Sequence, residues 1–291
     1  MICRGIDVMG VEWIISDVDG CLVHEEKSVP ALEQELTYAR EQLREIAKLL
    51  KQYPLVSSSV CTVRSLAATQ PIIEAVQCST LCVLEGGNVI YNPKTSEAYL
   101  LVKAEEKYHG LRESLGTLQE WAHEINDAEI TNALHVPMHV LRRVSDRKTV
   151  VTFEILPYHA PPLSGQDLYD VLRESFLPDR IKREIAEKKI RVNASRGALD
   201  ISVAITKRDG VEHIAQQHGI SPEAILGIGD RFHSDKVFLD YCGYAGVPKN
   251  ADEELKEHLK RRASAYVSTQ EETRGVLDII RYAMQQWDPK K

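Results

Sequence analysis

Residues 11–20 read VEWIISDVDG, a mostly apolar run that ends in two aspartates and a glycine. Such a run, closed by a turn signal, predicts a buried β-strand over residues 11–18 that stops at Asp19-Gly20. In a parallel sheet, ligands bind beyond the carboxyl ends of the strands. Asp17 and Asp19 would point to the same side of an extended chain. Both carboxylates are therefore predicted to lie where an active site would form.

The chain around this strand predicts an α/β protein. Strand-like runs at residues 55–62 and 80–85 alternate with helical spacing at 30–52 and 65–76. This order is typical of a doubly wound, Rossmann-like parallel sheet. The same alternation returns after Lys207.

The middle of the chain has a different pattern. A long amphipathic stretch at residues 105–125 precedes two predicted hairpins, at 137–156 and 190–203. Helices combined with paired hairpins indicate an α+β unit with an antiparallel sheet. We therefore expect residues 1–91 and 196–291 to form one core domain, with residues 92–195 inserted as a cap.

Composition excludes some classes of function. The 291 residues are 43% hydrophobic and 27% charged, which is ordinary for a globular protein. The net charge of −7 argues against a nucleic-acid partner. We expect no signal peptide, no membrane partner and a cytoplasmic protein, since no long apolar run occurs. The cysteines lack paired zinc-like spacing and fit a reducing compartment; they are Cys3, Cys21, Cys61, Cys78, Cys82 and Cys242.

The carboxylate pair suggests chemistry on phosphorus. Asp17 could attack phosphorus and form an aspartyl phosphate. Asp19 could protonate the leaving oxygen and then activate water. The alternative interpretation of these residues is a solvated Asp-x-Asp-Gly turn.

A second acidic pair follows another apolar run, at residues 225–228. Asp230 comes directly after Gly229, and Asp235 lies five residues further on. Mg²⁺ prefers oxygen ligands, which Asp17 and Asp230 would supply from two strand ends. Alternatively, Asp230 is a turn residue and Asp235 an acid at a helix N-terminus.

Two residues are candidates for binding phosphate. Thr62 ends a predicted strand, so its hydroxyl and the following amides could contact phosphate, or it could cap a helix. Lys207 opens a helix after the insertion, where its charge could hold phosphate and keep Asp17 ionised. A surface position is the alternative for this lysine.

The order of these pieces resembles the haloacid dehalogenase superfamily of phosphatases. The insertion between Thr62 and Lys207 is similar to its type IIB cap, found in Cof-like sugar phosphatases, sucrose-phosphate phosphatase and mannosyl-3-phosphoglycerate phosphatase. Residues 61–64 (CTVR), 85–91 (EGGNVIY) and 247–251 (VPKNA) resemble further segments of the family.

The resemblance implies a magnesium-dependent hydrolase for a phosphorylated sugar or similar small metabolite. It implies that Asp17 is the nucleophile and a metal ligand, and that Asp19 is the general acid/base, with its main-chain carbonyl also on the metal. Thr62 and Lys207 would bind phosphate, and Asn250 would organise that end of the site. Asp230 would bind the metal, and Asp235 would be a further ligand or a partner of a ligand. The chain departs from the family pattern at Cys21 (often Thr), Val63 (Gly) and Ser234 (Asn).

The substrate stays open at this stage. A basic cap residue would suit a second anionic group, whereas a sugar would require Asn, Asp and His. The polar candidates in the cap are His135, His139, Arg142, Arg143, Arg191, Asn193, Ser195 and Arg196. A phosphomutase of the phosphomannomutase type and a non-catalytic sugar-phosphate-binding regulator are the alternative functions. The sequence does not indicate an oligomeric state.

Overall fold

The structure is a computed structural model that describes residues 10–24, 29–134, 140–144, 146–156, 163–195 and 197–287, with residues 29–39 and 140–143 described by their backbone alone. Its larger sheet has five parallel strands in the order β12-β11-β10-β1-β2. These are β1 (Trp13–Ser16), β2 (Ser57–Val60), β10 (Ile225–Ile228), β11 (Tyr244–Val247) and β12 (Ala265–Val267). Because all five run in parallel, their carboxyl ends lie along one edge.

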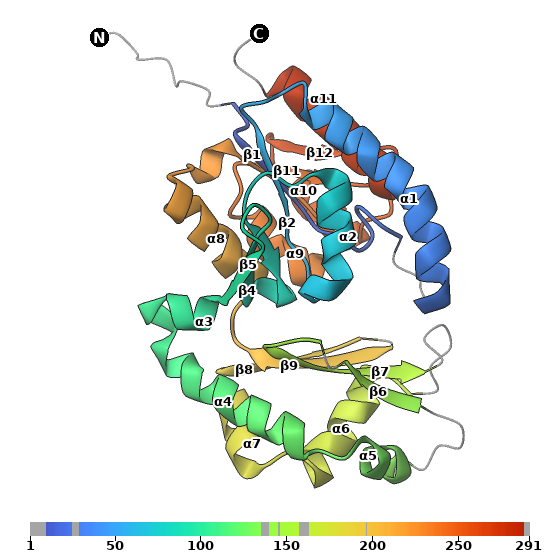
Figure 1. Ribbon diagram of the computed structural model, residues 1–291, viewed down its shortest axis with the longest axis vertical. Coiled ribbons are helices and arrows are strands. Elements are labelled where there is room, and N and C mark those ends of the chain that lie inside the picture. The colour runs from blue at the N-terminus through green and yellow to red at the C-terminus, as the bar shows by residue number, and fades with distance from the viewer. Residues whose placement is uncertain are drawn as a thin grey trace.

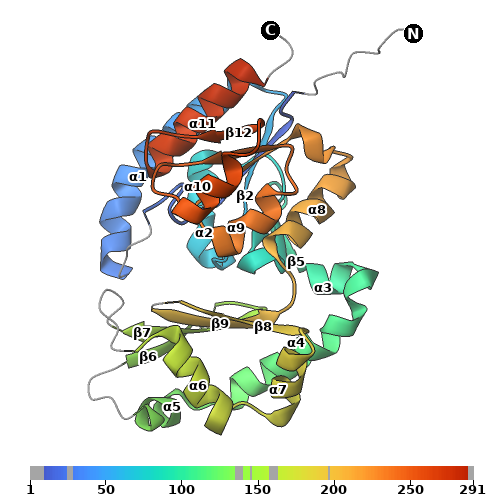
Figure 2. The ribbon, with the colours of Figure 1, turned by 180° about the vertical axis from the view of Figure 1, so that it is seen from behind.

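Helices cover both faces of this sheet (Figures 1 and 2). Side-chain alternation along β1 explains why, since Ile14 packs into one apolar cluster while Trp13 and Ile15 pack into the other. On the Ile14 face lie α1 (Val29–Leu50), α2 (Leu66–Val76) and α11 (Glu272–Gln286). On the opposite face lie α8 (Lys207–His218), α9 (Phe232–Leu239) and α10 (Glu253–Leu259), with the 3₁₀ turn η3 (Pro222–Ala224) preceding β10. The predicted doubly wound α/β fold is confirmed.

A smaller antiparallel sheet leads the chain out of the core. It consists of β3 (Cys82–Leu84), β4 (Val89–Asn92) and β5 (Glu97–Leu100), with η1 (Glu85–Gly87) between the first two strands. A parallel bridge between Cys61 and Val83 attaches β3 beside β2. Residues 91–96, where we expect the core to give way to the cap, lie largely in the β4–β5 hairpin, in which β4 pairs with strands on both sides.

The inserted unit is a four-stranded antiparallel sheet in the order β6-β7-β9-β8 with helices on one face. Its strands are β6 (Val140–Val144), β7 (Val150–Leu156), β8 (Ile190–Ala194) and β9 (Ala198–Val203). Its helices are α3 (Leu101–Ala104), α4 (His109–Glu124), α5 (Asp127–Ala133), α6 (Gly165–Ser175) and α7 (Asp179–Ala186), with η2 (Glu106–Tyr108) before α4. The helix expected over residues 105–125 is therefore divided between η2 and α4.

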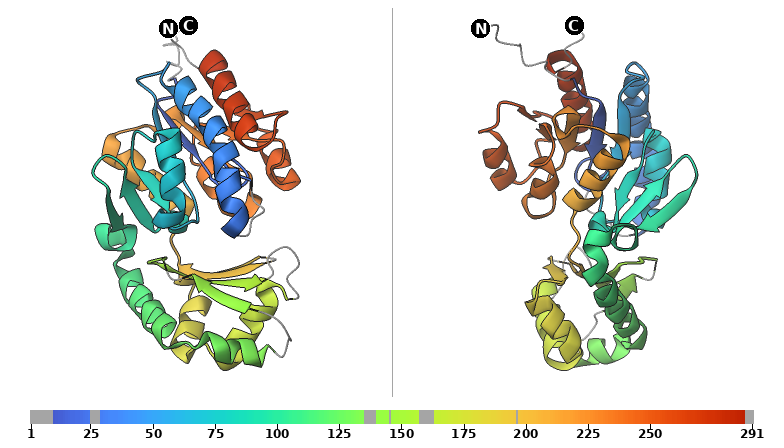
Figure 3. Two further views of the ribbon diagram at one scale, coloured as in Figure 1. Left: turned by 45° about the vertical axis from the view of Figure 1, so that its right-hand side comes forward. Right: turned by 90° about the vertical axis from the view of Figure 1, so that its left-hand side faces the viewer.

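The cap sheet lies beyond the carboxyl edge of the core sheet. Figures 1 and 3 show α4, α5, α6 and α7 on the side of this sheet away from the core, so its other face is turned toward the core. The cap has an apolar cluster of its own, which includes Trp121, Phe153 and Ile181. The domain limits at 91/92 and 195/196 stay a prediction; β9, which pairs with β7 and β8, begins at Ala198. Among the residues that the structure describes, every helix is too short or too polar to span a bilayer.

Candidate active site

The predicted catalytic residues meet at the carboxyl edge of the core sheet. Asp17 directly follows β1, Asp230 lies two residues after β10, and Asp235 lies in the first turn of α9. Oxygens of these three carboxylates lie within 4.8 Å of one another, and all three residues are buried. The Asp17 amide donates to the Ile228 carbonyl at 2.8 Å, which joins the ends of the two strands. The structure therefore brings together three of the four predicted acids.

Lys207 supplies the positive charge in this cluster. Its Nζ lies 2.9 Å from Asp17 Oδ1 and 2.6 Å from Asp235 Oδ1, and its side chain is 3% exposed. A capping box between Thr206 and Asp209 fixes the start of α8 and so the position of this lysine. Burial alone would lower the pKa of Lys207, but the charges of Asp17 and Asp235 raise it well above its usual value. Lys207 is thus a permanent cation beside the predicted nucleophile.

The three buried carboxylates carry more negative charge, when ionised, than the single positive charge of Lys207 neutralises. Burial, and then the charge of Asp235, raise the pKa of Asp17 to about 7, although Lys207 opposes the rise. Burial and the charge of Asp17 raise the pKa of Asp230 to about 9. A divalent cation would supply the missing charge, and the donor set consists of the hard oxygens that Mg²⁺ prefers. The residues present therefore fit a magnesium site.

Asp235 is already saturated by protein donors. Its Oδ2 accepts from the amides of Asp230 and Arg231, each at 2.9 Å. Its Oδ1 accepts from Lys207 Nζ at 2.6 Å and from Ser234 Oγ at 3.0 Å. These contacts favour the second predicted role, in which Asp235 orients Asp230 and Lys207 rather than binding the metal. Ser234, a departure from the family pattern, contributes to that network.

Asp19 lies outside the acidic cluster because an arginine holds it. Arg64 Nε donates to both oxygens of Asp19 at 3.0 Å, and Nη2 donates to Oδ1 at 2.5 Å. The Arg64 side chain is 17% exposed and the Asp19 side chain is 29% exposed. This pair orients the predicted acid/base, and Asp19 has to exchange this partner for substrate or water to transfer a proton. Arg64 was predicted only as part of a segment that resembles the family, and its contact with Asp19 was not predicted.

The turn after Asp17 requires a glycine. Gly20 has a φ of +69°, and a Cβ built there would lie 2.1 Å from Asp230 Oδ2. Cys21 places its Sγ 4.0 Å from Asp230 Oδ1. Burial and the charge of Asp230 raise the pKa of the Cys21 thiol well above its usual value, so it stays neutral. The departure at this position therefore puts a weak, uncharged donor beside the Asp230 carboxylate, a predicted metal ligand.

Thr62 and Asn250 lie near the turn that follows Asp17. The fully buried Thr62 accepts the Arg64 amide at its Oγ1, at 3.2 Å, which leaves the hydroxyl hydrogen to donate. Asn250 Nδ2 donates to the Gly20 carbonyl, and its Oδ1 accepts the Glu272 amide, both at 2.8 Å. Asn250 thus braces the turn, in line with an organising role.

One core carboxylate docks the cap, a contact that the sequence analysis did not predict. Glu85, 2% exposed, accepts the amides of Lys148 at 3.0 Å and Thr149 at 2.8 Å, and the Thr149 hydroxyl at 2.6 Å. Ser65 donates to Asp146 at the same loop. No local pattern in the sequence indicates a contact between residues 64 positions apart.

The face of the cap sheet that is turned toward the core, here called the open face, carries two of the residues predicted to recognise substrate. Arg191 and Asn193 are exposed, whereas Ile190, Val192 and Ala194 pack toward the cap helices. Ser195 instead bonds within its own turn, to Ala198. His135, His139 and Arg196 lie outside the described residues, as do the side chains of Arg142 and Arg143.

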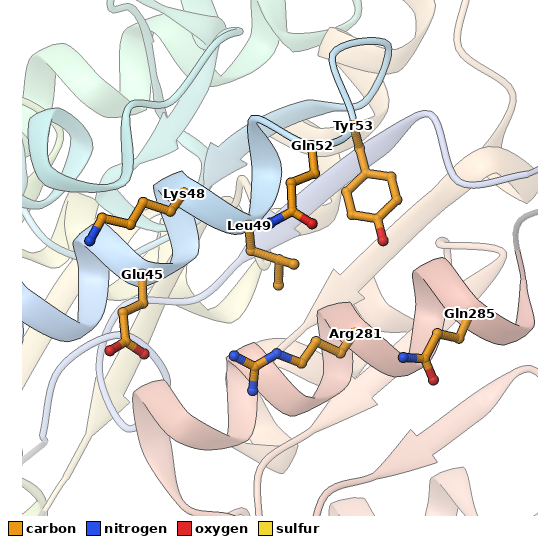
Figure 4. Close-up of a pocket in the computed structure, with 7 residues that line it drawn as sticks. All are labelled: Glu45, Lys48, Leu49, Gln52, Tyr53, Arg281 and Gln285. Carbon is orange, nitrogen blue, oxygen red and sulfur yellow. The ribbon is translucent and has the colours of Figure 1, made fainter.

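A hollow of about 520 Å³ lies elsewhere on the core, between α1 and α11 (Figure 4). It is lined by Glu45, Lys48, Leu49, Gln52, Tyr53, Arg281 and Gln285. Tyr53 precedes β2, so the hollow lies toward the amino ends of the strands. None of the predicted site residues lines it.

Comparison with known proteins agrees with this geometry. The chain matches the model of the haloacid dehalogenase-like hydrolases over residues 14–280. The protein belongs to this family. The predicted resemblance is thereby confirmed, and the chain is a member of a hydrolase family. No curated protein sequence matches it closely enough to count as a relative.

Solved structures of similar fold cover nearly the whole chain. A haloacid dehalogenase-like hydrolase from Bacteroides thetaiotaomicron has a TM-score of 0.59 at 16% identity, covering 93% of this chain and 98% of its own. The sucrose-phosphatase of Synechocystis, solved with sucrose and phosphate, has a TM-score of 0.56 at 14% identity, covering 94% and 98%. A HAD/Cof-like hydrolase from Plasmodium vivax has a TM-score of 0.56 at 15% identity, covering 97% of each chain. At these identities the likeness concerns the fold alone.

Proposed function

We propose that the protein is a magnesium-dependent phosphatase that hydrolyses a phosphomonoester of a sugar or similar small metabolite. The observation that carries this proposal is the buried cluster of Asp17, Asp230 and Asp235 around Lys207, at the carboxyl edge of the sheet. The carboxylates of Asp17 and Asp230 and the main-chain carbonyl of Asp19 would hold the metal. When bound, it would screen the repulsion between an anionic nucleophile and an anionic phosphate.

The first chemical step transfers the phosphoryl group to the protein. An Asp17 oxygen attacks phosphorus as the bond to the leaving oxygen breaks, and the proton of Asp19 passes to that oxygen. Thr62 and Lys207 hold the charge on the transferred group. Lys207 also favours the ionised form of Asp17 at the start of the step.

The second step releases phosphate. Asp19 takes a proton from water while the water oxygen attacks phosphorus and the bond to Asp17 breaks. This returns Asp17 to a carboxylate and Asp19 to its protonated form. The cap would exclude bulk water from the site during the first step.

The testing experiment measures phosphate release from a panel of sugar phosphates and phosphoglycerates, with magnesium or with EDTA. We expect magnesium-dependent release that disappears in Asp17→Asn. Asp179→Asn is the matched control, because this carboxylate is 96% exposed on the cap. The sucrose-phosphatase fold neighbour supports including sucrose phosphate in the panel.

Absence of release from every compound would contradict the proposal. Turnover stimulated by a sugar bisphosphate without phosphate release would then favour a phosphomutase. Failure to bind magnesium or beryllium fluoride would favour a non-catalytic regulator.

A further inference from the structure

Arg191 extends from the cap toward the phosphate-binding side of the core. Its strand, β8, turns Ile190 and Val192 toward the cap helices, so Arg191 lies on the open face. Its Nη2 lies 4.0 Å from the position of a Cβ built on Gly86, in η1 of the core. The guanidinium therefore reaches across from one domain to the other.

The segment that Arg191 approaches joins two predicted phosphate-binding residues. The Gly86 amide donates to the Thr62 carbonyl at 3.0 Å. A Cβ built on the next residue, Gly87, would lie 3.0 Å from the Lys207 amide. The cap arginine thus ends beside the segment packed between Thr62 and Lys207.

Among the residues that the structure describes, no direct contact neutralises the charge of Arg191. No hydrogen bond or ion pair joins its guanidinium to any residue within the described part of the chain. The nearest acids are used elsewhere: Asp200 pairs with Arg147 at 3.2 Å, and Asp209 accepts from Tyr108 and from its capping box.

Arg191 is a cation that protein surrounds in part and that still meets solvent. The side chain is exposed to water, yet enough protein surrounds it that burial lowers its pKa, with Asp209 and Asp200 opposing the change. Free energy is gained when a ligand supplies the charge-assisted hydrogen bonds that the protein leaves unmade. A planar guanidinium presents two parallel donors that match a carboxylate or a phosphate, which a neutral hydroxyl does not.

We propose that Arg191 selects the substrate by binding a second anionic group, a carboxylate or a phosphate, on the phosphomonoester. Thr62 and Lys207 would hold the transferred phosphate over Asp17, so the group that reaches Arg191 is another part of the molecule. This inference rests on the proposed phosphatase function and narrows its substrate class to phosphomonoesters with a second negative charge.

Two matched substrate pairs test the selection. The carboxylate pair is 2-phosphoglycerate and glycerol 2-phosphate, which differ by a carboxylate in place of a hydroxymethyl group. The phosphate pair is glucose 1,6-bisphosphate and glucose 6-phosphate. We expect the protein to prefer the anionic member of at least one pair by about 10- to 100-fold in kcat/KM, the range of a charge-assisted hydrogen bond. The pair that shows the preference identifies the anion.

Arg191→Gln should remove that preference while leaving kcat/KM for the neutral member within about twofold, and Arg191→Lys should retain part of it. Arg173→Gln is the matched control, because Arg173 is exposed on α6, away from the open face. Equal losses for both members of a pair would overturn the proposal, as would a wild-type protein with no preference in either pair.

A binding experiment separates this inference from the phosphatase proposal. If p-nitrophenyl phosphate and all other phosphomonoesters go unhydrolysed, the phosphatase proposal fails by itself. Calorimetric titration of Asp17→Asn with each pair, with and without Arg191→Gln, then decides the role of Arg191 without turnover. Tighter binding of the anionic member that depends on Arg191 supports the inference, and equal binding refutes it.

Discussion

We expect the acidic cluster to make the stability of the metal-free protein fall as pH rises. Folding raises the pKa of Asp230 from 3.8 to about 9, so its contribution is present below about pH 4 and is lost as pH approaches 9. Between about pH 6 and about pH 9, the folded protein retains a proton that the unfolded chain has released. One such proton lowers the free energy of unfolding by about 1.4 kcal/mol per pH unit, or about 4 kcal/mol over this window.

The measurement is the midpoint of thermal unfolding in EDTA, recorded across that pH window and repeated with magnesium. A loss of about 4 kcal/mol corresponds to a fall of roughly 8–16 °C for a domain of this size. Magnesium should restore most of this loss at the alkaline end and have little effect at the acidic end, because it binds the ionised carboxylates.

Asp230→Asn is the matched variant for this experiment. It removes the titrating group without changing its shape, so the slope in EDTA should flatten and the magnesium response should disappear. If the wild-type protein in EDTA is equally stable or more stable at about pH 9 than at about pH 6, the carboxylates ionise without penalty and the reasoning is wrong.

Three further perturbations test neighbouring contacts. Lys207→Met leaves the carboxylates without their cation, and we expect about 3–5 kcal/mol lower stability by calorimetry in EDTA; an unchanged midpoint would contradict the ion-pair argument. Gly20→Ala puts a Cβ 2.1 Å from Asp230 Oδ2, so magnesium titration should show weaker binding, about tenfold or more for a displaced ligand; wild-type affinity would show that the turn tolerates a side chain. Glu85→Gln weakens the carboxylate contact to the Thr149 amide, and hydrogen exchange there should accelerate by about tenfold or more; unchanged exchange would mean that other contacts dock the cap.

Much of the site could be predicted because the position of a residue directly after a strand of a parallel sheet follows from the local sequence. An apolar strand followed by an aspartate places that aspartate at the carboxyl edge of the sheet, whatever the rest of the chain does. Asp17 and Asp230 satisfied this rule separately, and the pairing of β1 with β10 brought them together. The choice between ligand and orienting partner for Asp235 required its hydrogen bonds, which no spacing reveals.

The contacts that were missed depend on side chains from distant segments. The pair between Asp19 and Arg64 spans 45 positions, and the contact between Glu85 and Thr149 spans 64. The first depends on how the segments after β1 and β2 pack together, and the second on how the cap packs on the core; sequence periodicity encodes neither. The β4–β5 hairpin was missed for a related reason, since Asn92-Pro93 is typical of a loop and the strands on either side are short.

The separate apolar cluster of the cap has a consequence for which substitutions this protein tolerates. Every residue in that cluster falls between Leu118 and Ile201, and none comes from the strands that carry Asp17 or Asp230. Substitutions within that cluster therefore leave the packing beneath Asp17 and Asp230 untouched. Selection can change which molecule the cap admits without altering the core site where we propose that phosphate is released.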